Sequence, residues 1–234
     1  MDDIAIRLEQ IEEKIETACT RSGRKRQEIK LMAVSKFQPI EAIESACKAG
    51  IKLFGESRVQ EGREKFSKFW EMHPRDGSLE LHLVGSLQRN KAKAAAAFFD
   101  CIQSVDRDSL IEELGALTAK RESPLMIMLE LQTGEETKAG FPDLDSLFKA
   151  AERVFSFPGL KPAGLMTMAP FTDDKKAIRA SFRQLKSARD ELEKRFNGYW
   201  SCLSMGMTSD YDIAIEEGSN LIRIGTAIFG AREN

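Results

Sequence analysis

The 234-residue sequence lacks the features of a membrane or secreted protein. No apolar run approaches the ~20 residues that a membrane-spanning helix needs. The amino terminus, Met-Asp-Asp, has no basic-then-apolar signal pattern. The four cysteines are far apart without a CxxC pair, and Cys47, Cys101 and Cys202 lie in apolar surroundings typical of reduced core thiols. We therefore expect a cytoplasmic protein with no membrane partner.

An excess of charge of one sign is also missing. The 35 basic residues nearly balance the 37 acidic ones, which leaves a net charge of −2 and predicts no nucleic-acid partner. Only two histidines occur, without a metal-ligand cluster, so no metal site is predicted. The motifs GxGxxG, GxxxxGK[ST], HExxH and GxSxG are all absent, which removes the common nucleotide-binding, metalloprotease and serine-hydrolase signatures.

What the sequence does contain is an alternation of strand-like and helix-like segments from end to end. Eight short apolar runs are bounded by turn or cap residues: 29–36, 52–57, 79–86, 101–105, 124–131, 160–168, 199–206 and 220–226. Strands separated by helices predict a parallel sheet. Eight such units in a chain of this length match an α/β fold of the (β/α)8 TIM-barrel type, in one domain over residues 1–234. An open doubly wound sheet, usually of fewer strands, is the alternative.

An additional helix precedes the first strand in this prediction. Apolar residues recur at helical spacing at Ile4, Leu8, Ile11, Ile15 and Ala18, with charged residues between them. We expect this N-terminal helix to cover one end of the fold.

Lys36 is the strongest candidate for chemistry. It ends the first apolar run, and Pro39 opens a helical pattern three residues later. The carboxyl end of a buried strand is where barrels and open α/β sheets place their functional residues. A lysine amine there can form a Schiff base with an aldehyde. The alternative is a solvated loop lysine.

A phosphate site is predicted in the loops after the seventh and eighth strands, where barrels commonly hold phosphate. The candidate residues are Ser204, Gly206 and Thr208 in the first loop, and Gly225 and Thr226 in the second. Backbone N–H groups near a helix N-terminus bind anions, and glycine lets the backbone approach closely. The alternative is that these hydroxyls only cap a helix and these glycines only make turns.

Arg223 and His82 are polar residues inside apolar runs. A guanidinium in a barrel strand needs a partner, because an unpaired buried charge is very costly. Arg223 therefore either pairs with an acid such as Glu130 or faces an acceptor on a ligand at the barrel mouth. His82 is interpreted as a hydrogen-bonded core or site-lining residue.

Several motifs, spread in order over nearly the whole chain, are similar to those of one family. They are Ala33-Val34-Ser35-Lys36, Phe54-Gly55-Glu56, Gly85-x-Leu87-Gln88-x-Asn90-Lys91, Ser104-Val105-Asp106, Lys138-x-Gly140, Gly164-Leu165-Met166-Thr167-Met168, Ser204-Met205-Gly206-Met207 and Arg223-Ile224-Gly225-Thr226-x-Ile228-Phe229-Gly230. Together they resemble the pyridoxal phosphate homeostasis proteins, which have an alanine-racemase-like barrel. One departure is that the family's Gly-Glu-Asn motif reads Gly55-Glu56-Ser57 here.

The resemblance implies a cofactor and a set of contacts. Pyridoxal 5′-phosphate (PLP) would be held on Lys36 as an internal aldimine. Its phosphate would be bound by residues 204–208 and by Gly225 and Thr226, and its pyridine nitrogen would face Arg223. The family is regarded as supplying or buffering PLP without an established turnover reaction. We accordingly expect a monomer whose recipients are PLP-requiring apo-enzymes.

Three features favour a carrier over an enzyme. An arginine at the pyridine nitrogen keeps that nitrogen unprotonated, and a neutral pyridine is a poor electron sink for carbanion chemistry. Only two tyrosines occur, Tyr199 and Tyr211, and neither is expected at the barrel mouth. The chain also ends soon after Thr226, so we expect no added β-domain of the racemase kind. The alternatives are a slow racemase or lyase of small amino acids with Lys36 as its base, and a barrel that binds another phosphorylated compound.

Overall fold

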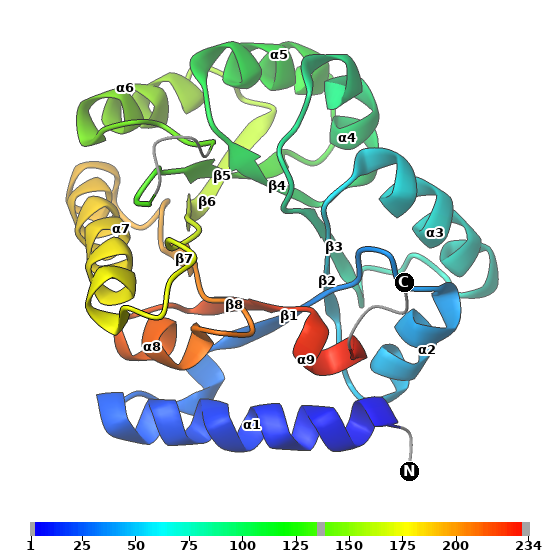
Figure 1. Ribbon diagram of the computed structural model, residues 1–234. Coiled ribbons are helices and arrows are strands. Elements are labelled where there is room, and N and C mark those ends of the chain that lie inside the picture. The colour runs from blue at the N-terminus through cyan, green and yellow to red at the C-terminus, as the bar shows by residue number, and fades with distance from the viewer. Residues whose placement is uncertain (1–2, 135–138, 231–234) are drawn as a thin grey trace.

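The computed structural model describes residues 3–134 and 139–230, so Lys138 of the Lys138-x-Gly140 motif lies outside the described residues. Within these ranges, eight parallel strands close into a barrel in the order of the sequence (Figure 1). Neighbouring parallel strands need a long crossover between them, and the helices supply it on the outside of the barrel. The prediction of a (β/α)8 barrel is confirmed.

Each strand lies within one of the eight predicted apolar runs. The strands are β1 (Lys30–Val34), β2 (Leu53–Glu56), β3 (Glu80–Leu83), β4 (Cys101–Val105), β5 (Leu125–Glu130), β6 (Leu160–Met166), β7 (Cys202–Ser204) and β8 (Leu221–Ile224). Most are shorter than the runs, because the apolar residues at the ends pack in the loops. The barrel closes between β1 and β8, where Met32 lies opposite Arg223.

The helices follow the strands in alternation. They are α1 (Asp3–Ser22), α2 (Ile40–Lys48), α3 (Val59–Met72), α4 (Ala92–Phe98), α5 (Asp108–Thr118), α6 (Leu144–Val154), α7 (Lys175–Phe196), α8 (Tyr211–Glu216) and α9 (Thr226–Phe229), with 3-10 turns η1 (Arg26–Glu28) and η2 (Arg89–Lys91). Asp143 and Asp174 cap α6 and α7 by accepting the backbone N–H groups of Ser146 and Lys176. No helix of the described residues is long and apolar enough to cross a membrane.

The N-terminal helix is present, but our expectation that it covers one end of the fold is wrong. Helix α1 runs along the side of the barrel against α8, α9 and α2 (Figure 1). Helix α8 has six residues and α9 only four, so they leave apolar surface beside β8 and β1 uncovered. The predicted apolar face of α1 fills this place, with Ile11 and Ile15 buried.

Two separate groups of apolar side chains stabilise the barrel. One fills the space between the strands and the helices, and the other fills the barrel interior with Met32, Leu53, Cys101, Met128, Met166 and Leu221. Successive side chains of a strand point to opposite faces, so the interior position of Met32 also places Val34 on the inward face of β1. Continued past the strand, this alternation directs Lys36 to the mouth of the barrel.

The four cysteines are free. Burial raises the pKa of Cys47 to about 11 and that of Cys202 to about 12, although nearby Lys30 opposes the second shift. Thiols of this kind carry little of the reactive thiolate at neutral pH.

Candidate functional site

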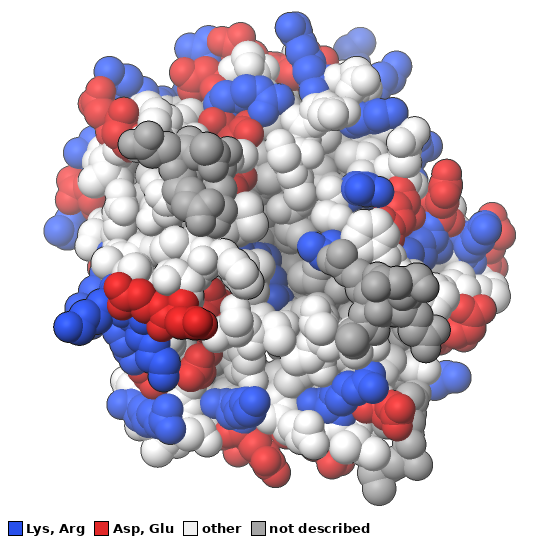
Figure 2. Space-filling view, viewed as in Figure 1, with Lys and Arg blue, Asp and Glu red and all other residues white. Residues whose placement is uncertain are grey.

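The mouth of the barrel lies at the carboxyl ends of the strands, and Lys36 lies there, two residues beyond the end of β1. Its side chain is half-buried, and no described residue forms a hydrogen bond or ion pair with its amine. Figure 2, viewed from the same side as Figure 1, shows a hollow at the centre of this face with Lys or Arg atoms at its base. The amine is therefore available to a ligand in this hollow.

Arg223 lies in β8, next to β1, with a buried side chain. Its Nη1 donates to the carbonyl oxygen of Ser204 at 2.6 Å and to the hydroxyl of Ser204 at 2.7 Å, and its Nη2 donates to the carbonyl oxygen of Thr167 at 2.8 Å. Among the described residues Arg223 forms no ion pair, so the predicted alternative of a pair with Glu130 is wrong. Its Nε donates to no described residue.

The pKa of Arg223 is lowered to about 10 by burial, while the charges of Glu130 and Asp210 oppose the shift. A pKa about three units above neutrality still leaves a guanidinium cation at pH 7. The neutral acceptors around it hold its orientation without neutralising it.

Glu130 is a second ionisable residue of the mouth. It ends β5 on the inward face shared with Met128, and it is buried. Burial raises its pKa to about 7, helped by Asp106 and opposed by Arg223. Such a pKa is common in functional sites. Our sequence analysis named Glu130 only as a partner for Arg223; an acid that ends an otherwise apolar strand was the available signal.

A chain of hydrogen bonds, the interior network, connects Arg223 with the other end of the barrel. The hydroxyl of Ser204 donates to Gln103 Oε1 at 2.6 Å, and the amide of Gln103 donates to His82 Nδ1 at 2.8 Å. His82 Nε2 then lies 3.3 Å from Glu80 Oε2. These contacts assign the roles of the two ring nitrogens: Nδ1 accepts from Gln103, and Nε2 donates to Glu80. The interpretation of His82 as a hydrogen-bonded core residue is confirmed, whereas Gln103 was missed.

The two predicted phosphate loops lie side by side at the ends of β7 and β8. Gly206 has φ +97°, and a Cβ there would lie 2.5 Å from the Cβ of Ala214. A Cβ on Gly225 would lie 3.2 Å from the carbonyl oxygen of Val34. The backbone N–H groups of Gly206, Gly225 and Thr226 have no acceptor among the described residues. Converging free N–H groups of this kind can bind an anion.

Thr208 lies in an exposed turn between β7 and α8. The alternative that it caps the following helix is wrong, because α8 begins only at Tyr211 and Asp210 is its N-cap. The Asp210 carboxylate accepts the N–H of Met207 at 2.6 Å and so stabilises this turn. The hydroxyl of Thr208 remains on the surface beside the Gly206 loop.

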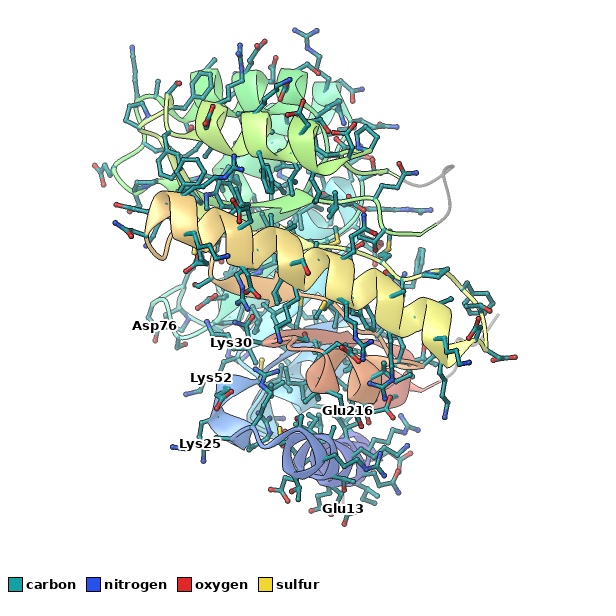
Figure 3. The ribbon with its side chains drawn as sticks, turned by 90° about the vertical axis from the view of Figure 1, so that its left-hand side faces the viewer. Glu13, Lys25, Lys30, Lys52, Asp76 and Glu216 are labelled. Atoms are coloured by element: carbon teal, nitrogen blue, oxygen red, sulfur yellow. The ribbon has the colours of Figure 1, made fainter. Side chains whose placement is uncertain are left out.

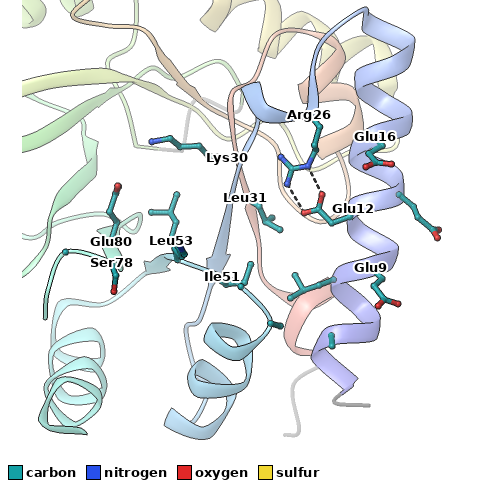
Figure 4. Close-up of a pocket in the computed structure, with 17 residues that line it drawn as sticks. Glu9, Glu12, Glu16, Arg26, Lys30, Leu31, Ile51, Leu53, Ser78 and Glu80 are labelled. Carbon is teal, nitrogen blue, oxygen red and sulfur yellow. Dashed lines mark hydrogen bonds and ion pairs between the residues drawn. The ribbon is translucent and has the colours of Figure 1, made fainter. Parts of the chain in front are cut away.

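A large groove lies at the opposite end of the barrel from Lys36, between α1 and the amino ends of the first three strands (Figure 4). Its volume is about 880 Å³, and Figure 3 shows Lys30 and Lys52 at this end of the molecule. Arg26 and Glu12 form a bidentate ion pair in its wall, at 2.6 and 2.7 Å. Glu80, the last member of the interior network, also lines the groove.

Comparison with known proteins places this geometry in a family. Residues 6–233 match the family model described as the N-terminal domain of alanine racemase. A pyridoxal phosphate homeostasis protein of Vibrio cholerae is 39% identical over 234 residues, which cover 100% of this chain and 98% of that protein. The chain belongs to the pyridoxal phosphate homeostasis protein family. The resemblance inferred from the sequence motifs is confirmed.

Solved structures agree with this assignment. PipY of Synechococcus elongatus, solved with PLP bound, is 34% identical with a TM-score of 0.82 and covers 97% of this chain and 100% of its own. An unknown protein from Bifidobacterium adolescentis is 30% identical with a TM-score of 0.91 and covers 98% of this chain and 97% of its own. Both proteins therefore share this barrel over nearly its full length.

Proposed function

We propose that this chain binds PLP covalently on Lys36, as an internal aldimine, and serves intracellular PLP homeostasis as a carrier or buffer. The observation that carries the proposal is the half-buried Lys36 amine at the barrel mouth, which has no partner among the described residues. The PLP-bound PipY structure and the relatives' names support it.

The residues at the mouth fit the three reactive parts of PLP. Lys36 would bond to its aldehyde carbon, and the free Nε of Arg223 would face its pyridine nitrogen. The phosphate would be held by the N–H groups of Gly206, Gly225 and Thr226, with the exposed hydroxyls of Thr208 and Thr226 beside them. The hydroxyl of Ser204 already binds Arg223 and Gln103, so in this proposal Ser204 orients Arg223.

The proposal also states that the protein holds PLP without catalysing a reaction on it. Bound PLP supplies an electron sink only as far as its ring nitrogen is protonated, and a cationic Arg223 there opposes protonation. Tyr211 is buried at the start of α8, and burial raises its pKa to about 12. Tyr199 precedes β7, at the end of the barrel opposite Lys36. Neither tyrosine is placed to serve as an acid or base beside Lys36.

A slow racemase or lyase of small amino acids is the second candidate function. The observation that favours it is Glu130, whose pKa of about 7 suits proton transfer near neutral pH. Exchange of the α-proton of L-alanine in D2O, faster than with free PLP and lost in Glu130→Gln, would establish this candidate. Equal exchange rates would favour the carrier.

The covalent proposal is tested by mixing the purified protein with PLP, reducing it with borohydride and mapping the modified lysine by mass spectrometry. We expect a single adduct on Lys36. The absence of an adduct, or adducts scattered over exposed lysines such as Lys68, would overturn the proposal. We further propose that the protein acts as a cytoplasmic monomer and passes PLP to PLP-requiring apo-enzymes. Gel filtration of the loaded protein, followed by recovery of activity in an apo-enzyme mixed with it, tests this part.

A further inference from the structure

The residues on either side of Lys36 are held from outside the barrel. Ser35 points away from the mouth, towards α3, because successive side chains alternate. Its hydroxyl donates to Glu56 Oε1 at 2.8 Å, and its carbonyl oxygen accepts the Lys65 ammonium at 2.6 Å. The backbone just before Lys36 is therefore fixed by a side chain of β2 and another of α3.

Phe37, just after Lys36, is held in an unusual conformation. Its φ of +63° lies in the left-handed region, which residues with a Cβ rarely adopt. Its N–H donates to Glu61 Oε1, and the Arg58 guanidinium lies 5.1 Å from the centroid of its ring. Backbone strain of this kind persists where the surroundings impose it, and it is concentrated at functional sites.

Lys65 connects these contacts into one unit. Besides Ser35, its ammonium donates to Glu56 Oε1 at 2.8 Å and to Glu61 Oε1 at 3.0 Å, so its three donors are all used. Glu56 is completely buried, and 9% of the Lys65 side chain is exposed. The second oxygen of Glu56, Oε2, is buried without a hydrogen-bond partner among the described residues.

This arrangement is more costly than a structural ion pair needs to be. A buried carboxylate with an unsatisfied oxygen and a strained backbone both reduce stability. Replacement of such a buried pair by apolar residues is often neutral or stabilising. The contacts of the cluster with the main chain are made to Ser35 and Phe37, the two neighbours of Lys36.

We propose that Glu56, Glu61 and Lys65 form a clamp that fixes the backbone around Lys36 and thereby aims its amine at the aldehyde of PLP. The inference rests on the proposed function, and the three are positioning residues that do not touch the cofactor. In the step they assist, the neutral Lys36 amine adds to the aldehyde carbon. The C=O bond is replaced by a C=N bond, and the oxygen leaves as water, which balances the two protons lost from the amine nitrogen.

The test uses Glu61→Ala, which removes the acceptor of the Phe37 N–H, with Glu64→Ala as the matched control. Glu64 is exposed on the same helix and has no partner among the described residues. Imine formation with PLP is followed by absorbance, and binding of pyridoxamine 5′-phosphate, which has no aldehyde, is measured in parallel. We expect Glu61→Ala to slow imine formation by roughly tenfold to a hundredfold. Affinity for pyridoxamine phosphate should stay within about twofold, because misplacement of Lys36 affects only the covalent step.

Two further variants keep the outcome decisive. Glu61→Gln retains an acceptor oxygen and should restore most of the rate, and Lys65→Met should slow the reaction relative to the exposed-site control Lys68→Met. Rates equal to the controls, or a parallel loss of pyridoxamine phosphate affinity and melting temperature, would overturn the clamp. If the wild-type protein forms no adduct on Lys36, the proposed function fails and the clamp fails with it. A wild-type adduct with unaffected variants overturns the clamp alone.

Discussion

One nitrogen of Arg223 donates to both oxygens of Ser204, the carbonyl oxygen at 2.6 Å and the hydroxyl oxygen at 2.7 Å. The hydroxyl accepts from Arg223 and donates its single proton to Gln103. The orientation of the guanidinium at the mouth is thus determined by side chains deeper in the barrel. Because Gln103 accepts from Ser204 and donates to His82, the loss of its side chain leaves two neighbours without this partner.

Replacement of Gln103 by leucine should therefore destabilise the protein strongly. The variant leaves His82 Nδ1 buried without a donor and the proton of the Ser204 hydroxyl buried without an acceptor. We expect a loss of about 2–4 kcal/mol in the free energy of unfolding. Urea denaturation measures it. The double variant Gln103→Leu/His82→Leu should recover part of the loss, since it removes one of the two orphaned groups. Strictly additive losses would show that the network is not coupled.

Glu130 should make stability depend on pH with a definite sign. Its pKa is raised in the folded protein from 4.5 to about 7, mainly by burial. The folded state then binds a proton more tightly than the unfolded state does. The stabilisation that this proton binding gives is fully present below pH 4.5 and is lost as the pH rises through 7. Between pH 4.5 and pH 8, the free energy of unfolding of the wild-type protein should fall by roughly 3 kcal/mol relative to that of Glu130→Gln. Urea titrations of both proteins across this range measure the difference, and parallel curves would contradict the assignment.

The sequence was sufficient to predict the barrel because each strand leaves a local pattern. Runs such as 101–105 and 160–168 contain their strands within a few residues, and the end of the first run places Lys36 at the mouth. The position of α1 was not predictable in this way. It depends on the shortness of α8 and α9, and helix ends without strong caps leave little trace in the sequence.

The side-chain contacts of the site were equally out of reach. Ser204 and Gln103 are 101 positions apart, and Lys65 reaches Ser35 across 30 positions. Such pairs are determined by the closure of the barrel, and no periodicity within one element records them. The strain at Phe37 was hidden for the same reason, since only the position of Glu61 on α3 explains it.

Gly206 can be tested for its role in shaping the phosphate loop. In Gly206→Ala the new Cβ would lie 2.5 Å from the Cβ of Ala214, in addition to the strain of φ +97°. Gly50 has φ +94° and open space around its missing Cβ, so Gly50→Ala measures the strain alone. We expect the free energy of unfolding to fall by about 1 kcal/mol in Gly50→Ala and by at least about twice that in Gly206→Ala. PLP binding should be weakened only in Gly206→Ala. Thermal unfolding and PLP titration of both variants provide the comparison, and equal effects would argue against a crowded loop.

Glu217 should show the opposite pH dependence from Glu130. Burial would raise its pKa, but hydrogen bonds from Arg183 and Arg179 outweigh burial and lower it. A lowered pKa stabilises the fold at pH values above the ordinary pKa of the carboxyl group. This stabilisation is lost as the pH falls through the pKa of the folded state. The ion pairs join α7 to α8, the helix that follows the Gly206 loop, and Arg183 is largely exposed. Because solvent screens such pairs, Glu217→Gln should cost only about 1 kcal/mol at pH 7 and less at pH 3.

The matched control for this prediction is Glu191→Gln. Glu191 also accepts from an arginine, Arg195 at 3.2 Å, but 41% of its side chain is exposed and both partners lie on α7. A pair within one helix contributes about 0.3–0.5 kcal/mol, so this variant should barely change the unfolding curve. If the two variants lose the same stability at pH 7, the contact between α7 and α8 contributes nothing beyond a surface pair. A larger loss in Glu217→Gln that disappears in acid would show that this contact holds α8, and with it the loop that precedes it, against the barrel.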